Sequence, residues 1–201
     1  MSGRMIGVVI LIFGFWPAVG TAGPITVWSR GFENGFPLEA TASGNWRVVT
    51  SDQAAHSGSR GADIIGATAA GGDTLVFDLS SEGFTDVGIE FWTKVRDGLE
   101  ADDFVRAEWS SDAGLNWEPL VTLTNVAAGD WVFNQFPLPV EANDNPNFGL
   151  RVDAVLSTGG DRMAFDDFAL SGTPVPEPAS LAMLALGSLA GFHRKFRRRF
   201  S

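Results

Sequence analysis

The sequence predicts an all-β sandwich in the middle of the chain, and two observations support this prediction. From Gly23 to Gly172 helical periodicity is nearly absent, and short segments that alternate apolar and polar residues recur between Gly, Asp, Asn and Pro. This stretch is also long enough for one domain with a substantial core. Many short strands in a chain of this size favour two packed antiparallel sheets.

The alternating segments place ten strands along the chain. They are expected at Ile25–Phe32, Trp46–Thr50, Gly61–Ile65, Thr74–Leu79, Val87–Arg96, Phe104–Ser110, Pro119–Thr124, Trp131–Pro137, Phe148–Val155 and Arg162–Ser171. In the fifth segment alternation sends inward a set consisting of Ile89, Phe91, Thr93 and Val95. In the sixth segment the inward set consists of Val105, Ala107 and Trp109.

Residues 1–22 have the features of a secretory signal peptide. One basic residue, Arg4, precedes an apolar run from Met5 to Trp16, and small residues follow as far as Ala22. We expect cleavage after Ala22, with cleavage after Gly20 as the alternative. The apolar run is short for a membrane span, which argues against an uncleaved anchor.

Residues 173–201 combine three features in a fixed order. Pro176, Glu177 and Pro178 precede an apolar run, Leu181 to Phe192, and a cluster of Arg and Lys closes the chain. As a helix this run is marginal for about 30 Å of hydrocarbon, although basic side chains that reach the interface lengthen it. The positive cluster is expected on the cytoplasmic side.

This order resembles the PEP-CTERM sorting tail of Gram-negative exopolysaccharide producers. The resemblance implies that Pro176, Glu177 and Pro178 form a processing signal, at or near which an exosortase, a membrane protease-transferase, cuts the chain. It also implies export across the inner membrane, transient anchoring in the membrane by the C-terminal transmembrane helix, and a final location at the cell surface or outside the cell. An ordinary tail anchor with a proline-rich linker is the alternative.

Charge is spread unevenly along the chain. Eight basic and twenty-three acidic side chains remain between Gly23 and Gly172, a formal charge near −15. Nucleic acid is therefore not an expected partner, because its binding needs basic patches, and cations are the expected companions. The chain has no cysteine, and His56 is the only histidine of the domain, which excludes Cys-based and His-rich metal sites.

Residues 110–117 fit the pattern S-x-D-x-G-x-x-W, through Ser110, Asp112, Gly114 and Trp117. This looks like the Asp box of sialidases and of many unrelated β proteins. Asp112 is expected to bind turn amides, Gly114 to take a positive φ, and Trp117 to pack under the hairpin. A sialidase propeller carries several copies and this chain carries one, so the motif predicts a structural hairpin.

Three further motifs mark the two ends of the domain. They are Gly31 to Gly35, His56 to Ala62, and Ala164 to Leu170. Their order is similar to that of MAM-type and related jelly-roll domains, although the cysteines of many MAM domains are missing. The resemblance implies an antiparallel jelly-roll β-sandwich in which the first and last strands lie side by side.

The same resemblance implies a structural Ca²⁺ held by an early acid and a late aspartate pair, here Glu33, Asp166 and Asp167. Calcium takes six to eight oxygens, and adjacent aspartates are poor strand formers that need compensation. Alternation sends Asp166 and Asp167 to opposite faces, one toward metal and one toward solvent. Alternatively, Asp166 caps a loop amide and Asp167 is solvated. Asp102 and Asp103 are interpreted as loop acids.

One outward set of side chains is a candidate sugar-binding face, because aromatic rings stack on pyranose C–H faces and charged groups bond hydroxyls. The set consists of Trp92, Lys94, Arg106, Glu108, Arg151 and Asp153, with Trp92, Arg106 and Arg151 expected to bind the ligand. The alternatives are a solvated sheet face and a Trp92 that is covered by a loop.

These features together predict a non-catalytic surface or matrix protein that associates with exopolysaccharide. The alternative is a secreted glycosidase with two carboxylates about 5–10 Å apart, although no nucleophile motif is present. Jelly-roll folds carry both binders and enzymes, so fold alone does not decide. A purely structural surface spacer is a third hypothesis.

Overall fold

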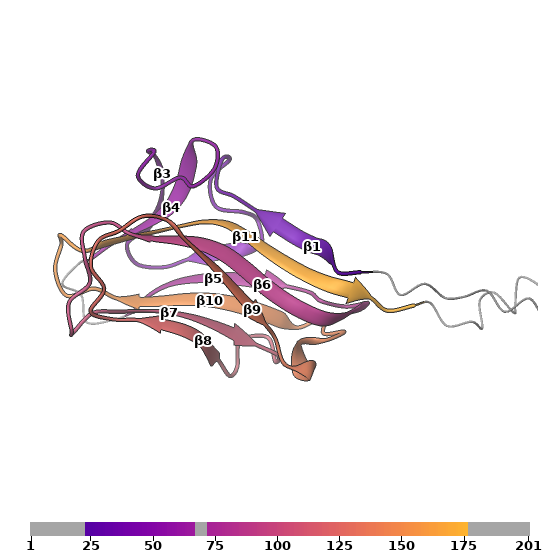
Figure 1. Cartoon of the computed structure of the whole chain (residues 1–201). Helices are drawn as coiled ribbons and strands as arrows, with labels where there is room; N and C mark the ends of the chain where they lie inside the picture. Colours follow the sequence, from indigo (N-terminus) through magenta and orange to yellow (C-terminus); the bar gives the residue numbers. More distant parts are fainter. Residues whose placement is uncertain (1–22, 67–71, 177–201) are drawn as a thin grey trace, which may run out of the picture.

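The computed structural model describes residues 23–66 and 72–176, which form two antiparallel sheets packed face to face (Figure 1). Sheet A has the order β3 (Trp46–Thr50), β4 (Arg60–Ile65), β11 (Arg162–Pro174), β6 (Phe84–Val95) and β9 (Val132–Pro137), and β1 (Ile25–Arg30) also pairs with β11. Sheet B has the order β2 (Ala40–Ala42), β5 (Asp73–Leu79), β10 (Phe148–Val155), β7 (Phe104–Ser110) and β8 (Glu118–Leu123). A single 3-10 turn, η1 (Val140–Ala142), follows β9. The predicted all-β sandwich is confirmed.

All ten predicted strands are present within a few residues of their expected bounds. The structure has one additional strand, β2, which the sequence did not predict. Its three residues, Ala-Thr-Ala, are too few to show an alternating pattern. β11 runs to Pro174, two residues beyond the expected end of the domain at Gly172.

The first and last strands lie side by side, as predicted. Ile25 of β1 is paired with Gly172 of β11, and Arg30 with Phe168. β4 occupies the same edge of β11 further toward its start, while β6 runs along the other edge. The two ends of the domain consequently leave the sandwich together (Figure 1).

Phenylalanine dominates the core between the two sheets. The largest fully buried side chains include Phe32, Phe77, Phe91, Phe148, Phe165 and Phe168. Phe168 lies at the centre of this group, with ring centroids 4.8 Å from Phe77 in sheet B and 5.2 Å from Phe91 in sheet A. The inward sets predicted for β6 and β7 are buried, so the predicted alternation is confirmed on both strands.

The last strand contains a β-bulge at the aspartate pair. Asp166 is paired with Trp92 and Ala169 with Glu90. Between these two pairs β11 advances by three residues and β6 by two, so β11 has one extra residue. Asp167 is the extra residue and takes a left-handed φ of 50°. The bulge returns Phe168 to the core and leaves both aspartates on the outer face. The prediction that alternation separates Asp166 from Asp167 is therefore wrong.

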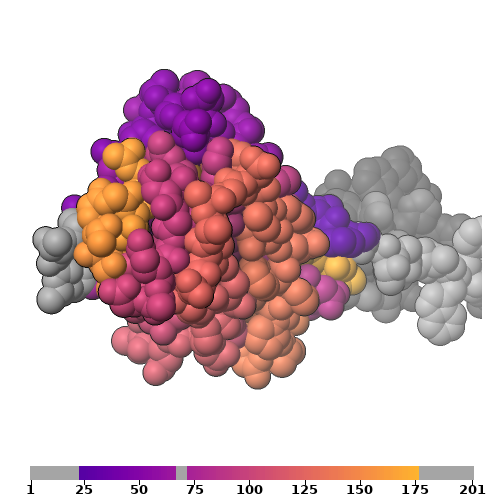
Figure 2. Space-filling view, turned by 60° about the vertical axis from the view of Figure 1, so that its left-hand side comes forward, coloured from indigo at the N-terminus to yellow at the C-terminus, as the bar shows by residue number. Residues whose placement is uncertain are grey.

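The β3–β4 loop, residues 51–59, folds back over the outer face of sheet A, the face turned away from sheet B. Ala54 and Ala55 of this loop are buried. A Cβ atom on Gly61 would stand 1.7 Å from the carbonyl oxygen of Ala54, so only glycine permits this close approach. β3 and β4 stand at the top of the molecule in Figure 1, and indigo and purple atoms also form the top of Figure 2.

The predicted hairpin of the Asp box is confirmed between β7 and β8. Asp112 accepts hydrogen bonds from the backbone of Asn116 at 2.9 Å and from its side-chain amide at 2.6 Å. Gly114 takes a φ of +80°, and a Cβ atom there would stand 2.9 Å from the Trp117 ring. The motif therefore has a structural role in this hairpin.

Candidate functional site

Three acids hold the β3–β4 loop in place: Glu33 of the β1–β2 loop, and Asp166 and Asp167 of β11. Glu33 accepts hydrogen bonds from the backbone amides of Ser59 and Arg60, each at 2.8 Å, and from the Ser59 hydroxyl at 2.9 Å. The amides of Arg60 and Ser59 hold the pKa of Glu33 below its ordinary value. Glu33 is thus the anchor for the end of the loop that leads into β4.

The aspartate pair on the bulge of β11 anchors the middle of the same loop. Asp166 Oδ2 accepts the backbone amides of His56 and Ser57 at 2.9 and 3.2 Å, and its Oδ1 accepts the amide of Asp167 at 2.9 Å. Burial raises the pKa of Asp166. Asp167 contacts the side chains instead, at 2.7 Å from His56 Nδ1 and 2.6 Å from the Ser57 hydroxyl.

These contacts bear on the calcium predicted at Glu33, Asp166 and Asp167. Each of the six carboxylate oxygens already lies within hydrogen-bond distance of an N–H or O–H group or of the His56 ring nitrogen. A calcium ion would have to use the remaining lone pairs or displace the loop. The direct bonds to the loop already compensate for two aspartates in a strand, and the calcium site stays a prediction.

The loop places His56 in an aromatic cluster on the outer face of sheet A. The His56 ring stacks on Trp92 with centroids 3.8 Å apart and planes 12° apart, and Trp131 meets His56 edge-on at 5.5 Å. Phe133 of β9 lies 5.2 Å from Trp92 and remains 46% exposed. The sequence interpretation had left open whether a loop covers Trp92, and His56 covers one face of its ring.

A groove of about 320 Å³ opens beside this cluster, and we call it the Trp92 groove. The side chains that set its chemistry are Ser29, Arg30, Glu90, Trp92, Phe133 and Asp167. They come from β1, β6, β9 and β11, which pairing in sheet A brings together. Of these residues, sequence analysis had assigned a ligand or metal role only to Trp92 and Asp167, because the others become neighbours only through long-range pairing.

The structure separates the three residues predicted to bind a ligand. Trp92 lies on sheet A, whereas Arg106 and Arg151 lie on the outer face of sheet B, on neighbouring strands β7 and β10. The predicted single face of six residues is therefore wrong. Alternation fixes which way a side chain points but leaves open which sheet the strand joins.

The outer face of sheet B is an ion-pair network. Arg106 contacts both Glu108 and Asp153 at 2.9 Å, and Arg151 also pairs with Glu108. The Arg151 guanidinium lies 4.5 Å from the centre of the Trp117 ring. The charges of Arg106 and Arg151 are thus already satisfied within the face.

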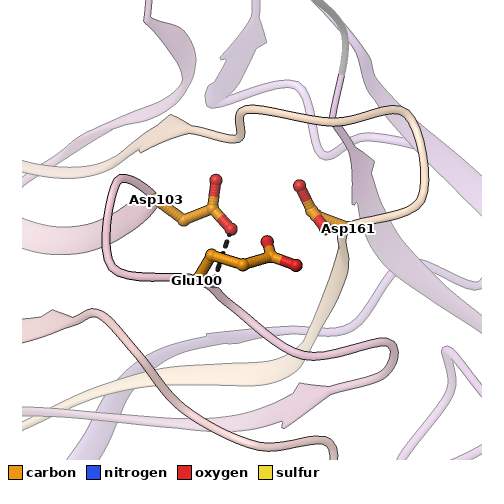
Figure 3. Close-up of side chains that lie close together, drawn as sticks. All are labelled: Glu100, Asp103 and Asp161. Carbon is orange, nitrogen blue, oxygen red and sulfur yellow. Dashed lines mark hydrogen bonds between the residues drawn. The ribbon is translucent and has the colours of Figure 1, made fainter.

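A cluster of three carboxylates lies between the β6–β7 and β10–β11 loops (Figure 3). The cluster consists of Glu100, Asp103 and Asp161, and their potential metal-ligand atoms lie within 4.8 Å of one another. Among residues 23–66 and 72–176, no other group of three or more Asp, Glu, His or Cys side chains meets this criterion. Hydrogen bonding with Asp103 and burial raise the pKa of Glu100. Asp103, interpreted from sequence as a loop acid, is only 2% exposed and accepts the amide of Ser157 at 2.6 Å.

Fold and sequence together define the class of protein to which this chain belongs. It is an exported protein in which a jelly-roll β-sandwich precedes a C-terminal sorting tail. Residues 174–199 match the PEP-CTERM protein-sorting motif, which includes the predicted Pro176, Glu177 and Pro178. No curated protein matches the chain.

Solved structures with the same fold include carbohydrate-binding and adhesin domains. The CBM22-1 xylan-binding domain of Paenibacillus barcinonensis Xyn10C is 16% identical, with a TM-score of 0.53, and covers 78% of this chain and 100% of its own. TmCBM61, solved with beta-1,4-galactotriose, is 20% identical, with a TM-score of 0.50 and coverage of 70% and 92%. The K1 cleaved adhesin domain of Lys-gingipain from Porphyromonas gingivalis is 16% identical, with a TM-score of 0.54 and coverage of 74% and 97%. These likenesses confirm the predicted jelly-roll fold.

The predicted terminal segments fall mostly outside the described residues. These segments are the signal peptide at 1–22, the apolar run from Leu181 to Phe192, and Glu177 with Pro178. Within residues 23–66 and 72–176, no helix has the length and apolar character needed to cross a membrane. Pro176 is described and is exposed just beyond the end of β11.

Proposed function

We propose that the domain is a non-catalytic carbohydrate-binding module that associates with exopolysaccharide at the cell surface. The observation that carries the proposal is the Trp92 groove, with Phe133 exposed at its edge. Aromatic rings gathered beside polar and charged side chains at a concave site are typical of small-molecule and sugar binding. The rings offer flat apolar surface to the C–H face of a pyranose, and Ser29, Arg30 and Glu90 offer partners for its hydroxyls.

Structures of the same fold support this proposal. One is named as a xylan-binding domain and another was solved with a galactotriose. The sequence identity between this chain and these domains is 20% or less. The type of sugar and the position of its binding site therefore have to be inferred from this chain's own residues. The Trp92 groove is where these residues combine exposed aromatic surface with polar and charged side chains.

The arrangement of carboxylates supports a binding rather than a catalytic role. In the cluster of Glu100, Asp103 and Asp161, the two aspartates are 2% and 3% exposed and accept hydrogen bonds from loop amides. Buried in this way, they stabilise the loops and do not face a substrate. A secreted glycosidase remains the alternative, and release of reducing ends from xylan, galactan or host exopolysaccharide by the purified protein would establish it.

The binding proposal is tested with two matched phenylalanine substitutions. Phe133→Ala removes an exposed ring from the groove, and Phe104→Ala removes a partly exposed ring from the outer face of sheet B. We expect Phe133→Ala to weaken retention of the protein in gels that contain host exopolysaccharide, with Phe104→Ala close to the parent. The opposite order would place binding on sheet B, near Arg106 and Arg151, and would contradict the proposed site.

We also propose that an exosortase removes the tail after export. The tail leaves the domain directly after β11, where Val175 donates a backbone hydrogen bond to Gly83 and Pro176 is exposed. Intact-mass measurement on protein from the native cell surface should give a chain that ends near Pro178. A surface protein that retains the Arg-rich end would contradict this step.

A further inference from the structure

The Trp92 groove contains a carboxylate without a partner. Glu90 precedes Trp92 by two residues on β6, so both side chains stand on the outer face of sheet A. Among the described residues Glu90 makes no hydrogen bond and no ion pair, and it is only partly exposed to solvent. A partly desolvated charge beside aromatic rings is costly until an opposite charge pairs with it.

The other charged groups of the groove are already engaged. Arg30 pairs with Glu39 at 3.3 Å and donates to the carbonyl oxygen of Ser29 at 2.9 Å. Asp167 is held by His56 and Ser57. The uncompensated charge that a ligand would meet in the groove is therefore negative.

The charge of the whole domain acts in the same direction. Eight basic against twenty-three acidic side chains between Gly23 and Gly172 leave a formal charge near −15. Such a field attracts cationic polymers and repels polyuronates, over a range of about 10 Å at moderate salt. A neutral glycan would feel neither effect.

We propose that the groove binds glycans that carry free amino groups, that is, segments of 2-amino-2-deoxyhexose that are not N-acetylated. The inference rests on the proposed glycan-binding function and specifies its ligand class. The ammonium group pairs with Glu90, in a charge-assisted hydrogen bond that an acetamide cannot replace. The same cation lies next to Trp92 and Phe133, whose ring faces attract positive charge while the sugar ring stacks on them.

The test compares three soluble probes on the immobilised full-length chain in mild detergent. They are chitosan oligomers, the corresponding N-acetylated oligomers, and xylan oligomers, which are neutral. We expect the free-amine oligomers to bind about tenfold more tightly than the acetylated ones at low salt, as one charge-assisted hydrogen bond implies. The difference should decrease as salt is added.

Glu90→Gln keeps the shape of the side chain and removes its charge. It should reduce the preference for free amines to about twofold or less, because the free-amine oligomers lose more affinity than the acetylated ones do. Glu118→Gln is the matched control, since Glu118 is an exposed carboxylate at the start of β8 in sheet B. It should leave the tenfold preference intact, and melting curves of both variants should match the parent.

The outcomes separate this inference from the function on which it rests. Equal binding of acetylated and free-amine oligomers overturns the inference and leaves the glycan-binding function standing. Binding of none of the three probes overturns both. Polylysine that binds as tightly as the chitosan oligomers, with the same dependence on Glu90, also overturns the inference, because charge without sugar rings would then suffice.

Discussion

Removing the carboxylate of Asp166 is expected to release the β3–β4 loop from sheet A. The side chain is 1% exposed and accepts backbone amides from His56, Ser57 and Asp167. In Asp166→Ala these three N–H groups lose their acceptor, and no other side chain among the described residues takes its place.

The size of the effect follows from these contacts. A hydrogen bond to a charged group contributes about 1.5–3 kcal/mol, but the buried carboxylate also carries a desolvation cost, which is visible as its raised pKa. His56 and Ser57 lie in an exposed loop, so water reaches their amides once the loop moves. We therefore expect Asp166→Ala to lower the free energy of unfolding by about 2–4 kcal/mol.

Equilibrium unfolding in urea, followed by tryptophan fluorescence, measures this change. Limited proteolysis should at the same time show faster cleavage within residues 51–59. Asp52→Ala is the control, because Asp52 lies in the same loop, is exposed and makes no hydrogen bond with described residues. An Asp166→Ala protein as stable as Asp52→Ala would refute the role of Asp166 as the anchor of the loop.

Three further predictions concern the core, the metal and the hairpin. Phe168→Ala should cost about 3–5 kcal/mol in urea unfolding, since Phe168 is fully buried at the centre of the core. Added Ca²⁺ should raise the melting temperature more than Mg²⁺ does, and Asp166→Asn should abolish the rise. A rise lost in Asp103→Asn instead would contradict the predicted ligands. Hydrogen bonds from Asn116 lower the pKa of Asp112, so its stabilisation is present at neutral pH and is lost as pH falls from about 3.8 through the lower folded pKa. Melting curves of the parent and Asp112→Asn should therefore approach each other only as the pH is lowered below about 3.8.

The last strand shows what strand alternation alone predicts and where it stops. Alternation correctly placed the inward residues of β6 and β7, because those strands are regular over Ile89–Val95 and Val105–Trp109, the stretches that hold these residues. It failed at Phe165-Asp-Asp-Phe168, where strict alternation buries only one of the two phenylalanines. Two large apolar residues separated by two aspartates are themselves a signal for an inserted residue. A reading that kept both rings in the core would have predicted the bulge.

The composition of the site depends on pairings that the sequence does not state. Trp92, Arg106 and Arg151 share an outward orientation, but β6 pairs with β9 and β11 whereas β7 pairs with β8 and β10. Glu100 and Asp161 likewise come together from two loops far apart in the chain (Figure 3). Neither grouping follows from local pattern, since long-range pairing determines both.

The β3–β4 loop connects two of the acids predicted to bind calcium, Glu33 and Asp166, with the proposed glycan-binding surface at Trp92. Glu33 and Asp166 fix the backbone of this loop, and the fixed loop carries the His56 ring that stacks on Trp92. With one face of Trp92 held by His56, the indole has a defined orientation toward the groove. The Trp92 side chain loses little conformational freedom when a sugar binds, which favours affinity.

A protein in which this loop is released from sheet A should therefore bind glycan more weakly, even though it keeps Trp92. Asp166→Ala is thus expected to reduce retention by host exopolysaccharide under conditions where the domain remains folded. Unchanged retention would show that the loop acids stabilise the fold and have no part in positioning the ligand surface.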